Sequence, residues 1–304
     1  MEDHPIPGRA SLAYQNEKFL NSPDARTLRF VAEYLEPQGR LRRENIQDTI
    51  VFFGSARIQS AESAQAALEE ITECDRMNRL AAVREGHAPD ASVEEGRRRA
   101  AERALSLSHY YEDARELARL LSLWGEALPS RRRRFVVTSG GGPGIMEAAN
   151  RGAAEAGGKT AGFNIRLPFE QIPNPYITPA LNFEFHYFFM RKFWFAYLAK
   201  ALVAFPGGFG TLDEVMEMLT LVQTQKLNKK IVVVLYGKSY WEEIVNFQAL
   251  ADWGTISPDD LDLFHFADSP REAFELLTSE LDRLYLRPTA LAEEETPAIT
   301  KTRG

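Results

Sequence analysis

Cysteine is nearly absent from this sequence: Cys74 is the only one among 304 residues. A single thiol cannot form an intrachain disulfide, which suits a reducing cytoplasm. Apolar runs are short, and none approaches the ~20 residues needed to span a bilayer. The N-terminus, with Glu2, Asp3 and two prolines, has neither the basic nor the apolar region of a signal peptide. We therefore expect a cytoplasmic protein with no membrane partner.

Excess positive charge is also missing, because the net charge is -7. This excludes a global basic footprint for nucleic acid, and we expect no nucleic-acid partner. Four consecutive arginines at 131–134 form one local basic cluster, which we interpret as a solvated loop or as an effector or interface patch. We expect no metal, since the histidines are scattered along the chain: His4, His87, His109, His186 and His265. We also expect no cofactor, since no lysine lies in an evident Schiff-base context.

Short buried strands alternate with helical stretches along most of the chain. This alternation predicts an α/β fold, a Rossmann-like, doubly wound, mostly parallel sheet with an N-terminal helical extension. The predicted strands are 49–53, 134–139, 159–165, 182–186, 201–205, 230–235 and 263–267. The predicted helices of the domain include 145–153, 188–198, one that starts at Thr211, 240–250 and 270–286.

Three segments make up the predicted organisation. Residues 1–47 form an N-terminal arm with helical stretches at 17–20 and 25–35, which packs on the main domain or on a partner subunit. Residues 48–286 form the catalytic domain, with a helical insert at about 61–127 that has breaks near Gly86–Pro89 and Gly96. The tail 287–304 is rich in Ala, Glu, Pro and Thr, and we expect it to be disordered.

Two glycine turns follow predicted parallel strands, Pro206-Gly207-Gly208 and Gly140-Gly141-Gly142-Pro143-Gly144. A glycine turn between a buried strand and a helix N-terminus makes an anion site, because its free N–H groups point at the ligand. The other interpretation is a tight turn in which glycine serves geometry alone. Neither turn continues as a P-loop or fits G-x-G-x-x-G well, so the pattern favours a single phosphate.

Local signals near these turns add further candidates. Thr211 and Glu214 have the spacing of a capping box, which predicts that the helix starts at Thr211. Gly54 and Ser55 follow the first strand, where small residues suit ligand approach. Arg57 is placed to meet an anion, although a plain turn with a surface arginine explains it as well.

Several stretches together resemble the LOG (LONELY GUY) phosphoribohydrolases, often labelled "lysine decarboxylases". The resemblance covers about residues 49–285, and the N-terminal arm and insert suggest the longer bacterial branch. The family's PGGxGTxxE signature resembles Pro206-Gly207-Gly208-Phe209-Gly210-Thr211-Leu212-Asp213-Glu214. The family's GGGPGIMEAAN turn and arginine–lysine pair resemble residues 140–150 and Arg191-Lys192, and its loops resemble 164–170 and 174–176.

The resemblance implies hydrolysis of the N-glycosidic bond of a nucleoside 5′-monophosphate, a cytokinin riboside monophosphate or AMP, to the free base and ribose 5-phosphate. Positive charge develops on the ribosyl ring, and Glu214 would stabilise it electrostatically or as a nucleophile, assisted by Arg191. The alternatives are helix capping for Glu214 and a surface ion pair for Arg191. We expect the nucleotide to contact Gly207, Gly208, Gly210, Thr211, Gly142, Gly144, Ser139, Lys192, Gly54 and Ser55, with Asn164 or Glu147 near the sugar or base.

Two further functions remain open at this point. One is a non-catalytic nucleotide sensor, and the other is a carrier of the molybdenum-cofactor type, whose fold and glycine signature are close to those of the LOG family. The presence of both Arg191 and Glu214 favours the hydrolase. The resemblance also implies a homodimer or a higher homo-oligomer.

Overall fold

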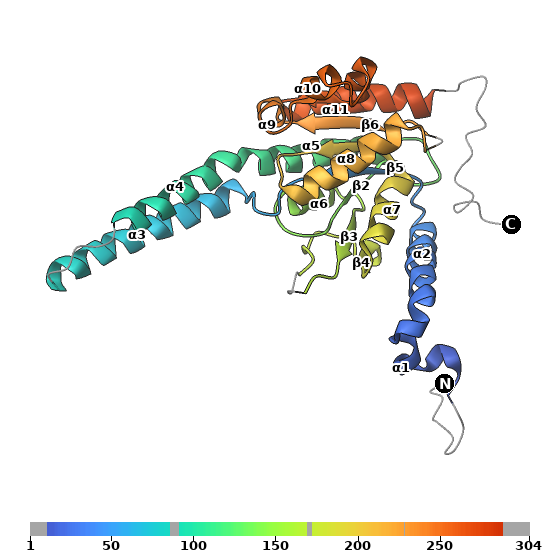
Figure 1. The fold of residues 1–304 in the computed structure, drawn as a ribbon, viewed down its shortest axis with the longest axis horizontal. Helices are drawn as coiled ribbons and strands as arrows, with labels where there is room; N and C mark the ends of the chain where they lie inside the picture. The colour runs from blue at the N-terminus through green and yellow to red at the C-terminus, as the bar shows by residue number, and fades with distance from the viewer. Residues whose placement is uncertain (1–10, 86–90, 169–171, 228, 288–304) are drawn as a thin grey trace.

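A computed structural model describes residues 11–85, 91–168, 172–227 and 229–287. Within these residues a parallel seven-stranded sheet forms the centre of the molecule, in the order β4-β3-β2-β1-β5-β6-β7 (Figure 1). The predicted doubly wound α/β fold is confirmed, and every strand pair is parallel. The strands are β1 Thr49–Phe53, β2 Val136–Ser139, β3 Ala161–Ile165, β4 Asn182–Phe185, β5 Ala199–Ala204, β6 Val232–Tyr236 and β7 His265–Ala267.

Helices cover both faces of the sheet, which is why β1 and β6 are buried along their whole length. One face packs against α2 (Arg26–Arg43), α7 (Phe188–Leu198), α8 (Phe209–Gln223), α9 (Lys238–Ile244) and α10 (Phe247–Asp252). The other face packs against α5 (His109–Glu126), α6 (Ile145–Glu155) and α11 (Pro270–Leu281), and a π-helix, Asp282–Leu286, continues α11.

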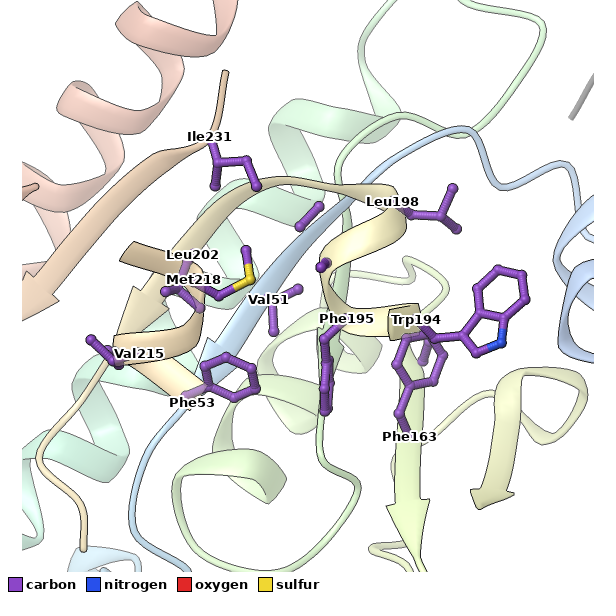
Figure 2. Close-up of a cluster of buried hydrophobic side chains, with 14 of the residues drawn as sticks. Val51, Phe53, Phe163, Trp194, Phe195, Leu198, Leu202, Val215, Met218 and Ile231 are labelled. Atoms are coloured by element: carbon purple, nitrogen blue, oxygen red, sulfur yellow. The ribbon is translucent and has the colours of Figure 1, made fainter. Parts of the chain in front are cut away.

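The core on the first face holds the helix that carries Arg191. Figure 2 shows Phe195 of α7 between Phe53 and Phe163, with ring centroids 4.9 and 5.2 Å apart, respectively. Val215 and Met218 of α8 join the same cluster and are almost fully buried. These contacts fix α7 and α8 on the sheet side by side.

Two long helices of the insert project from the body (Figure 1), α3 (Ala61–Glu85) and α4 (Ala91–Leu107). They pack against each other, and Arg97 of α4 pairs with Asp75 of α3 at 3.0 Å. The predicted break near Gly96 is wrong, because Gly96 lies inside α4. The predicted break at Gly86–Pro89 lies outside the described residues.

The N-terminal arm is longer in its helical part than the sequence indicated. Short helices at Ala13–Gln15, Glu17–Leu20 (α1) and Pro23–Ala25 lead into α2, which runs on to Arg43 through Pro37. Glu33 of α2 fastens the arm to α7, since its carboxylate accepts the backbone N–H groups of His186 and Tyr187 at 2.7 and 3.3 Å. The predicted disorder of the tail concerns residues 288–304, which lie outside the described part of the chain.

One predicted helix is divided. The stretch 240–250 forms the end of α9 and most of α10, and Asn246 between them caps α10 by accepting the N–H of Ala249 at 2.9 Å. Short 3-10 helices, Pro179–Leu181 and Pro258–Leu263, precede β4 and β7. Over the described residues, no helix combines the length and the hydropathy that a membrane crossing requires.

Candidate active site

A cleft of about 690 Å³ opens at the carboxyl ends of β1 and β5. The strand order reverses between these two strands, and open α/β sheets bind ligands at such a switch point. The cleft is lined by Gly54, Ser55, Ala56, Arg57, Met146, Arg191, Gly207, Gly208, Phe209, Gly210, Thr211, Leu212, Glu214, Tyr240 and Ile244. Nine of these residues are candidates predicted from the sequence, and the fold brings them together: Gly54, Ser55, Arg57, Arg191, Gly207, Gly208, Gly210, Thr211 and Glu214.

The turn after β5 presents the first N–H groups of α8 to the cleft. α8 starts at Phe209, and Gly208 is its N-cap residue, without a side-chain cap hydrogen bond. The predicted capping box with Thr211 as the cap is therefore wrong, because Thr211 already lies in the first turn. A helix leaves its first four N–H groups without intrahelical partners, so N–H groups of this turn remain for an anion.

Neighbouring segments hold this turn in place. The N–H of Ser55 donates to the carbonyl of Pro206 at 2.9 Å, which joins the loop after β1 to the turn after β5. The Tyr240 hydroxyl donates to the carbonyl of Gly207 at 2.6 Å. Tyr240 was missed by sequence reasoning, although its place in α9, just after β6, puts it at the same edge of the sheet. The rule that ligands bind at the carboxyl ends of parallel strands was the available signal.

Arg191 of α7 and Glu214 of α8 form an ion pair in the cleft, with Nη1 3.4 Å from Oε1. Their side chains are only 11% and 13% exposed. The Nε of Arg191 donates to the carbonyl of Phe163 at 2.8 Å, so the guanidinium is fixed from behind by β3. Burial raises the pKa of Glu214 to about 7, against the opposing effect of Arg191. Burial likewise lowers the pKa of Arg191 below its ordinary value.

The second glycine turn lies beside the cleft and supports it. Gly140 leaves room for Arg191, because a Cβ there would lie 2.6 Å from the Nη2 atom. Gly144 is the N-cap of α6 with φ of 70°, and the N–H of Ile145 donates to the carbonyl of Ser55 at 3.1 Å. Asn174 donates to the carbonyls of Gly141 and Gly142, so this turn is fastened to the loop at 174–176. Gly142 and Gly144 are not among the cleft-lining residues.

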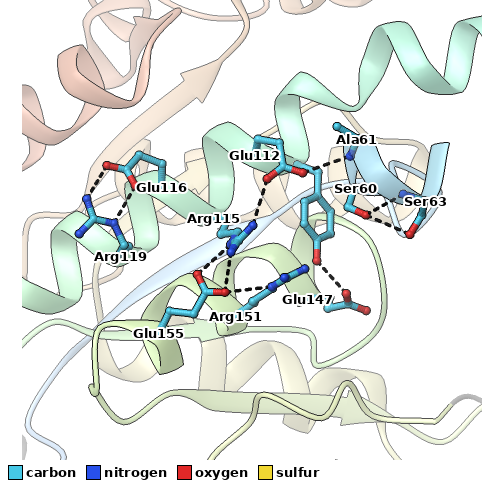
Figure 3. A network of polar contacts seen from close by, with 11 residues as sticks. Ser60, Ala61, Ser63, Glu112, Arg115, Glu116, Arg119, Glu147, Arg151 and Glu155 are labelled. Atoms are coloured by element: carbon cyan, nitrogen blue, oxygen red, sulfur yellow. Dashed lines mark hydrogen bonds and ion pairs between the residues drawn. The ribbon is translucent and has the colours of Figure 1, made fainter. Parts of the chain in front are cut away.

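Four other predicted candidates point elsewhere. Ser139 is fully buried and donates to Asn150 at 2.6 Å, and Asn164 donates to Asn182 and to the carbonyl of Phe183. Lys192 pairs with Asp213 and Glu217 at 2.9 and 2.8 Å. Glu147 accepts the Tyr111 hydroxyl at 2.7 Å, next to a network in which Glu155 bridges Arg115 and Arg151 (Figure 3). None of these four predicted residues is among those that line the cleft.

Apolar side chains also line the cleft. Met146, Leu212 and Ile244 line it, and Phe209 stands at its edge with 93% of its surface exposed. The cleft therefore combines an anion site, a buried charged pair and an apolar wall. This combination suits a ligand that carries both a phosphate and a flat or apolar group.

Comparison with known proteins finds two matches in sequence. The family model described as "Possible lysine decarboxylase" matches residues 146–277. A curated relative is the cytokinin riboside 5′-monophosphate phosphoribohydrolase LOG5 of Arabidopsis thaliana, 28% identical over 149 residues. That alignment covers 48% of this chain and 64% of the relative, which is less than two thirds of its length. With the motifs described above, these matches support a LOG-family protein, at low sequence identity.

Solved structures with a similar arrangement include two proteins that handle molybdenum cofactor. The molybdenum cofactor binding protein of Rippkaea orientalis is 21% identical, with a TM-score of 0.41. The match covers 57% of this chain and 88% of the chain of that protein. The molybdenum cofactor carrier protein of Chlamydomonas reinhardtii is 23% identical, with a TM-score of 0.40, over 57% of this chain and 88% of its own.

Proposed function

We propose that this protein hydrolyses the N-glycosidic bond of a nucleoside 5′-monophosphate, AMP or a cytokinin riboside monophosphate. The products are the free base and ribose 5-phosphate. The observation that carries this proposal is the buried Arg191–Glu214 pair in the cleft that also holds the N-terminus of α8. The activity named for the LOG5 relative supports the same substrate class.

The helix N-terminus accounts for binding of the phosphate. The N–H groups of the Gly208–Thr211 turn and the helix dipole both favour an anion, and the dipole contributes about 0.3–1 kcal/mol at an exposed terminus. Arg57 lines the same cleft and adds positive charge. The apolar residues Met146, Leu212 and Ile244 would then face the base or its substituent.

Glu214 accounts for the chemistry. As the bond between C1′ and the base nitrogen breaks, its electron pair leaves with the base and positive charge develops on C1′ and the ring oxygen. A carboxylate in a poorly solvated cleft stabilises that charge more than it would in water, either as a countercharge or by forming a transient ribosyl ester. Water then supplies the hydroxyl group to C1′ and the proton to the base. Arg191 holds the carboxylate in place and favours its ionised form.

Replacement of Glu214 tests this assignment. We expect Glu214→Gln to lower release of adenine from AMP, and of isopentenyladenine from its riboside monophosphate, by at least about 100-fold, because the electrostatic stabilisation is lost. Nucleotide binding, measured by calorimetry, should persist, since the Gly208–Thr211 turn that binds the phosphate is intact. Glu217→Gln is the matched control, because Glu217 lies on the same helix and pairs with Lys192 outside the cleft. Equal rates in the two variants would contradict a catalytic role for Glu214.

A further inference from the structure

A second concave site lies at the amino end of β2, between the end of α5 and the start of this strand. Its volume is about 240 Å³. β2 runs from this pocket to the glycine turn beside the cleft, so the length of the strand separates the two sites. The pocket is lined by Asn45, Gly125, Glu126, Leu128, Ser130, Arg131, Arg132, Arg133 and Arg134.

Positive charge dominates the wall of this pocket. Four arginines line it against one acidic residue, Glu126, which pairs with Arg133. Asp48 adds a second carboxylate through its 2.7 Å pair with the Nε of Arg134. Cationic side chains therefore outnumber carboxylates in a chain whose net charge is -7. A concave surface concentrates such a field and attracts anions.

Arg134 supplies an independent sign that an acceptor is missing. Its side chain is only 9% exposed, and its Nη2 atom is buried without a hydrogen-bond partner among the described residues. A buried guanidinium N–H group without an acceptor is costly, and charge-assisted hydrogen bonds to an oxyanion are among the strongest that proteins form. Arg134 is among the residues that line the pocket, so an oxyanion bound there lies beside this side chain.

We propose that this pocket binds a small polyanion of the diphosphate type. Arginine forks bind phosphate oxygens in bidentate fashion, and several adjacent forks suit a group with two phosphates. The volume lies below the ~300–1,000 Å³ of pockets that enclose whole small-molecule ligands. The site therefore accepts inorganic pyrophosphate or the terminal diphosphate of a larger molecule and leaves a nucleoside outside.

Calorimetric titration with inorganic pyrophosphate tests this proposal on the full chain. The Gly208→Asp background removes competition from the cleft, because a carboxylate at the phosphate turn repels the anion. A side chain there has space, since no atom lies within 4 Å of an added Cβ. We expect one pyrophosphate to bind per chain. Addition of Arg131→Ala and Arg132→Ala should weaken binding at least 10-fold, which is about 1.4 kcal/mol.

Arg98→Ala with Arg99→Ala is the matched control, because these two exposed arginines of α4 are also adjacent and both pair with Glu95. Binding to the control should stay within about twofold of the parent, since the same charge is removed elsewhere. The single variant Arg131→Glu provides a second test at an exposed position and should also weaken binding.

Three results would overturn the proposal. They are an absence of pyrophosphate binding at millimolar concentration, equal weakening in both double variants, and binding of inorganic phosphate as tight as that of pyrophosphate. GTP, tested in the same background, distinguishes the source of the diphosphate. Binding of GTP that is lost with Arg131 and Arg132 identifies the terminal phosphates of a nucleotide, and binding of pyrophosphate alone identifies the inorganic ion.

Discussion

Glu214 is buried where its charge costs free energy, and the catalytic proposal requires that charge. Its pKa is raised to about 7 because burial penalises the carboxylate more than Arg191 and Lys192 favour it. The group is therefore poised between its two protonation states near neutral pH. The surrounding cleft keeps it available: α8 supplies it, α7 supplies Arg191, and the glycine at 140 leaves room for the guanidinium.

The raised pKa predicts a pH dependence of the reaction. The ionised carboxylate is the active form, so kcat/KM should rise with pH through about 7 and level off above it, as it reports the free enzyme. The profile is measured with AMP between pH 5.5 and 8.5. A flat profile over that range would contradict the role given to Glu214.

The same pKa predicts how stability changes with pH. A folded-state pKa above the unfolded value means that the folded protein binds more protons between pH ~4.5 and ~7, so the free energy of unfolding falls as pH rises through that window. Glu214→Gln lacks this titration. Between pH 5 and pH 8, we therefore expect the free energy of unfolding of the wild type to fall by about 2–3 kcal/mol relative to that of the variant. Urea unfolding at the two pH values measures it, and a difference independent of pH would argue against the buried acid.

At the scale of elements, the N-terminal arm supports the helix that carries Arg191. Glu33 of α2 accepts two N–H groups at the start of α7, and its own carbonyl accepts the indole N–H of Trp194 at 2.9 Å. Arg29 donates to the Tyr187 hydroxyl at 3.2 Å. The arm therefore anchors the two residues that lead into α7, whose N-cap residue Tyr187 makes no side-chain cap hydrogen bond.

Removal of the Glu33 carboxylate tests this support. Glu33→Ala should lower stability by about 1 kcal/mol, the usual net contribution of a hydrogen bond, and should lower the hydrolysis rate because α7 positions Arg191. Glu36→Ala, on the same helix, removes an exposed partner of Arg40 and should change stability by no more than about 0.5 kcal/mol. Thermal unfolding and base release are measured for both. Equal effects of the two substitutions would count against this anchoring role of Glu33.

The sequence predicted these elements best where one face or two faces are regularly apolar. β1 and α7 have the predicted bounds, and the signature turn lies at the switch point as the strand pattern indicated. Failures arose where a local polar contact divides a predicted helix, or where a helix tolerates a residue of low helix propensity. Asn246 divides a predicted helix by capping α10, and Gly96 sits inside α4 without any neighbour within 4 Å of an added Cβ.

The residues of the candidate site were likewise predictable only in part. Glycines and charged residues near strand ends were predictable, but whether a side chain faces the cleft depends on neighbours far along the chain. Asn164 turns to Asn182, and Lys192 turns to the acidic residues on the other side of Glu214. Tyr240 of α9 donates its hydroxyl to the carbonyl of Gly207 in the turn after β5, 33 residues away in the sequence. Spacing alone cannot reveal such contacts.

At the scale of the whole molecule, the arm presents an apolar stripe to solvent. Leu28, Val31 and Leu35 of α2 are about half exposed, on a helix that stands at the side of the body (Figure 1). The opposite side of α2 packs on α7 through Tyr34 and Glu33. We propose that a second copy of the chain covers the stripe, in keeping with the homo-oligomer that the LOG resemblance implies.

Light scattering tests the proposed assembly. We expect a mass of at least twice the 34.3 kDa of one chain. Leu28→Glu with Leu35→Glu should shift the mass toward the single chain, because burying two carboxylates opposes association. Leu123→Glu is the control, since Leu123 is similarly exposed on α5, away from the arm. A monomeric wild type would contradict the proposal.

The most direct test of the central claim is the fate of AMP incubated with the wild-type protein, followed by chromatography of all products. We predict adenine and ribose 5-phosphate in equal amounts, accumulating over many turnovers per chain. Recovery of intact AMP bound to the protein, with neither product formed, would contradict the hydrolase and leave a nucleotide-binding protein with the same cleft.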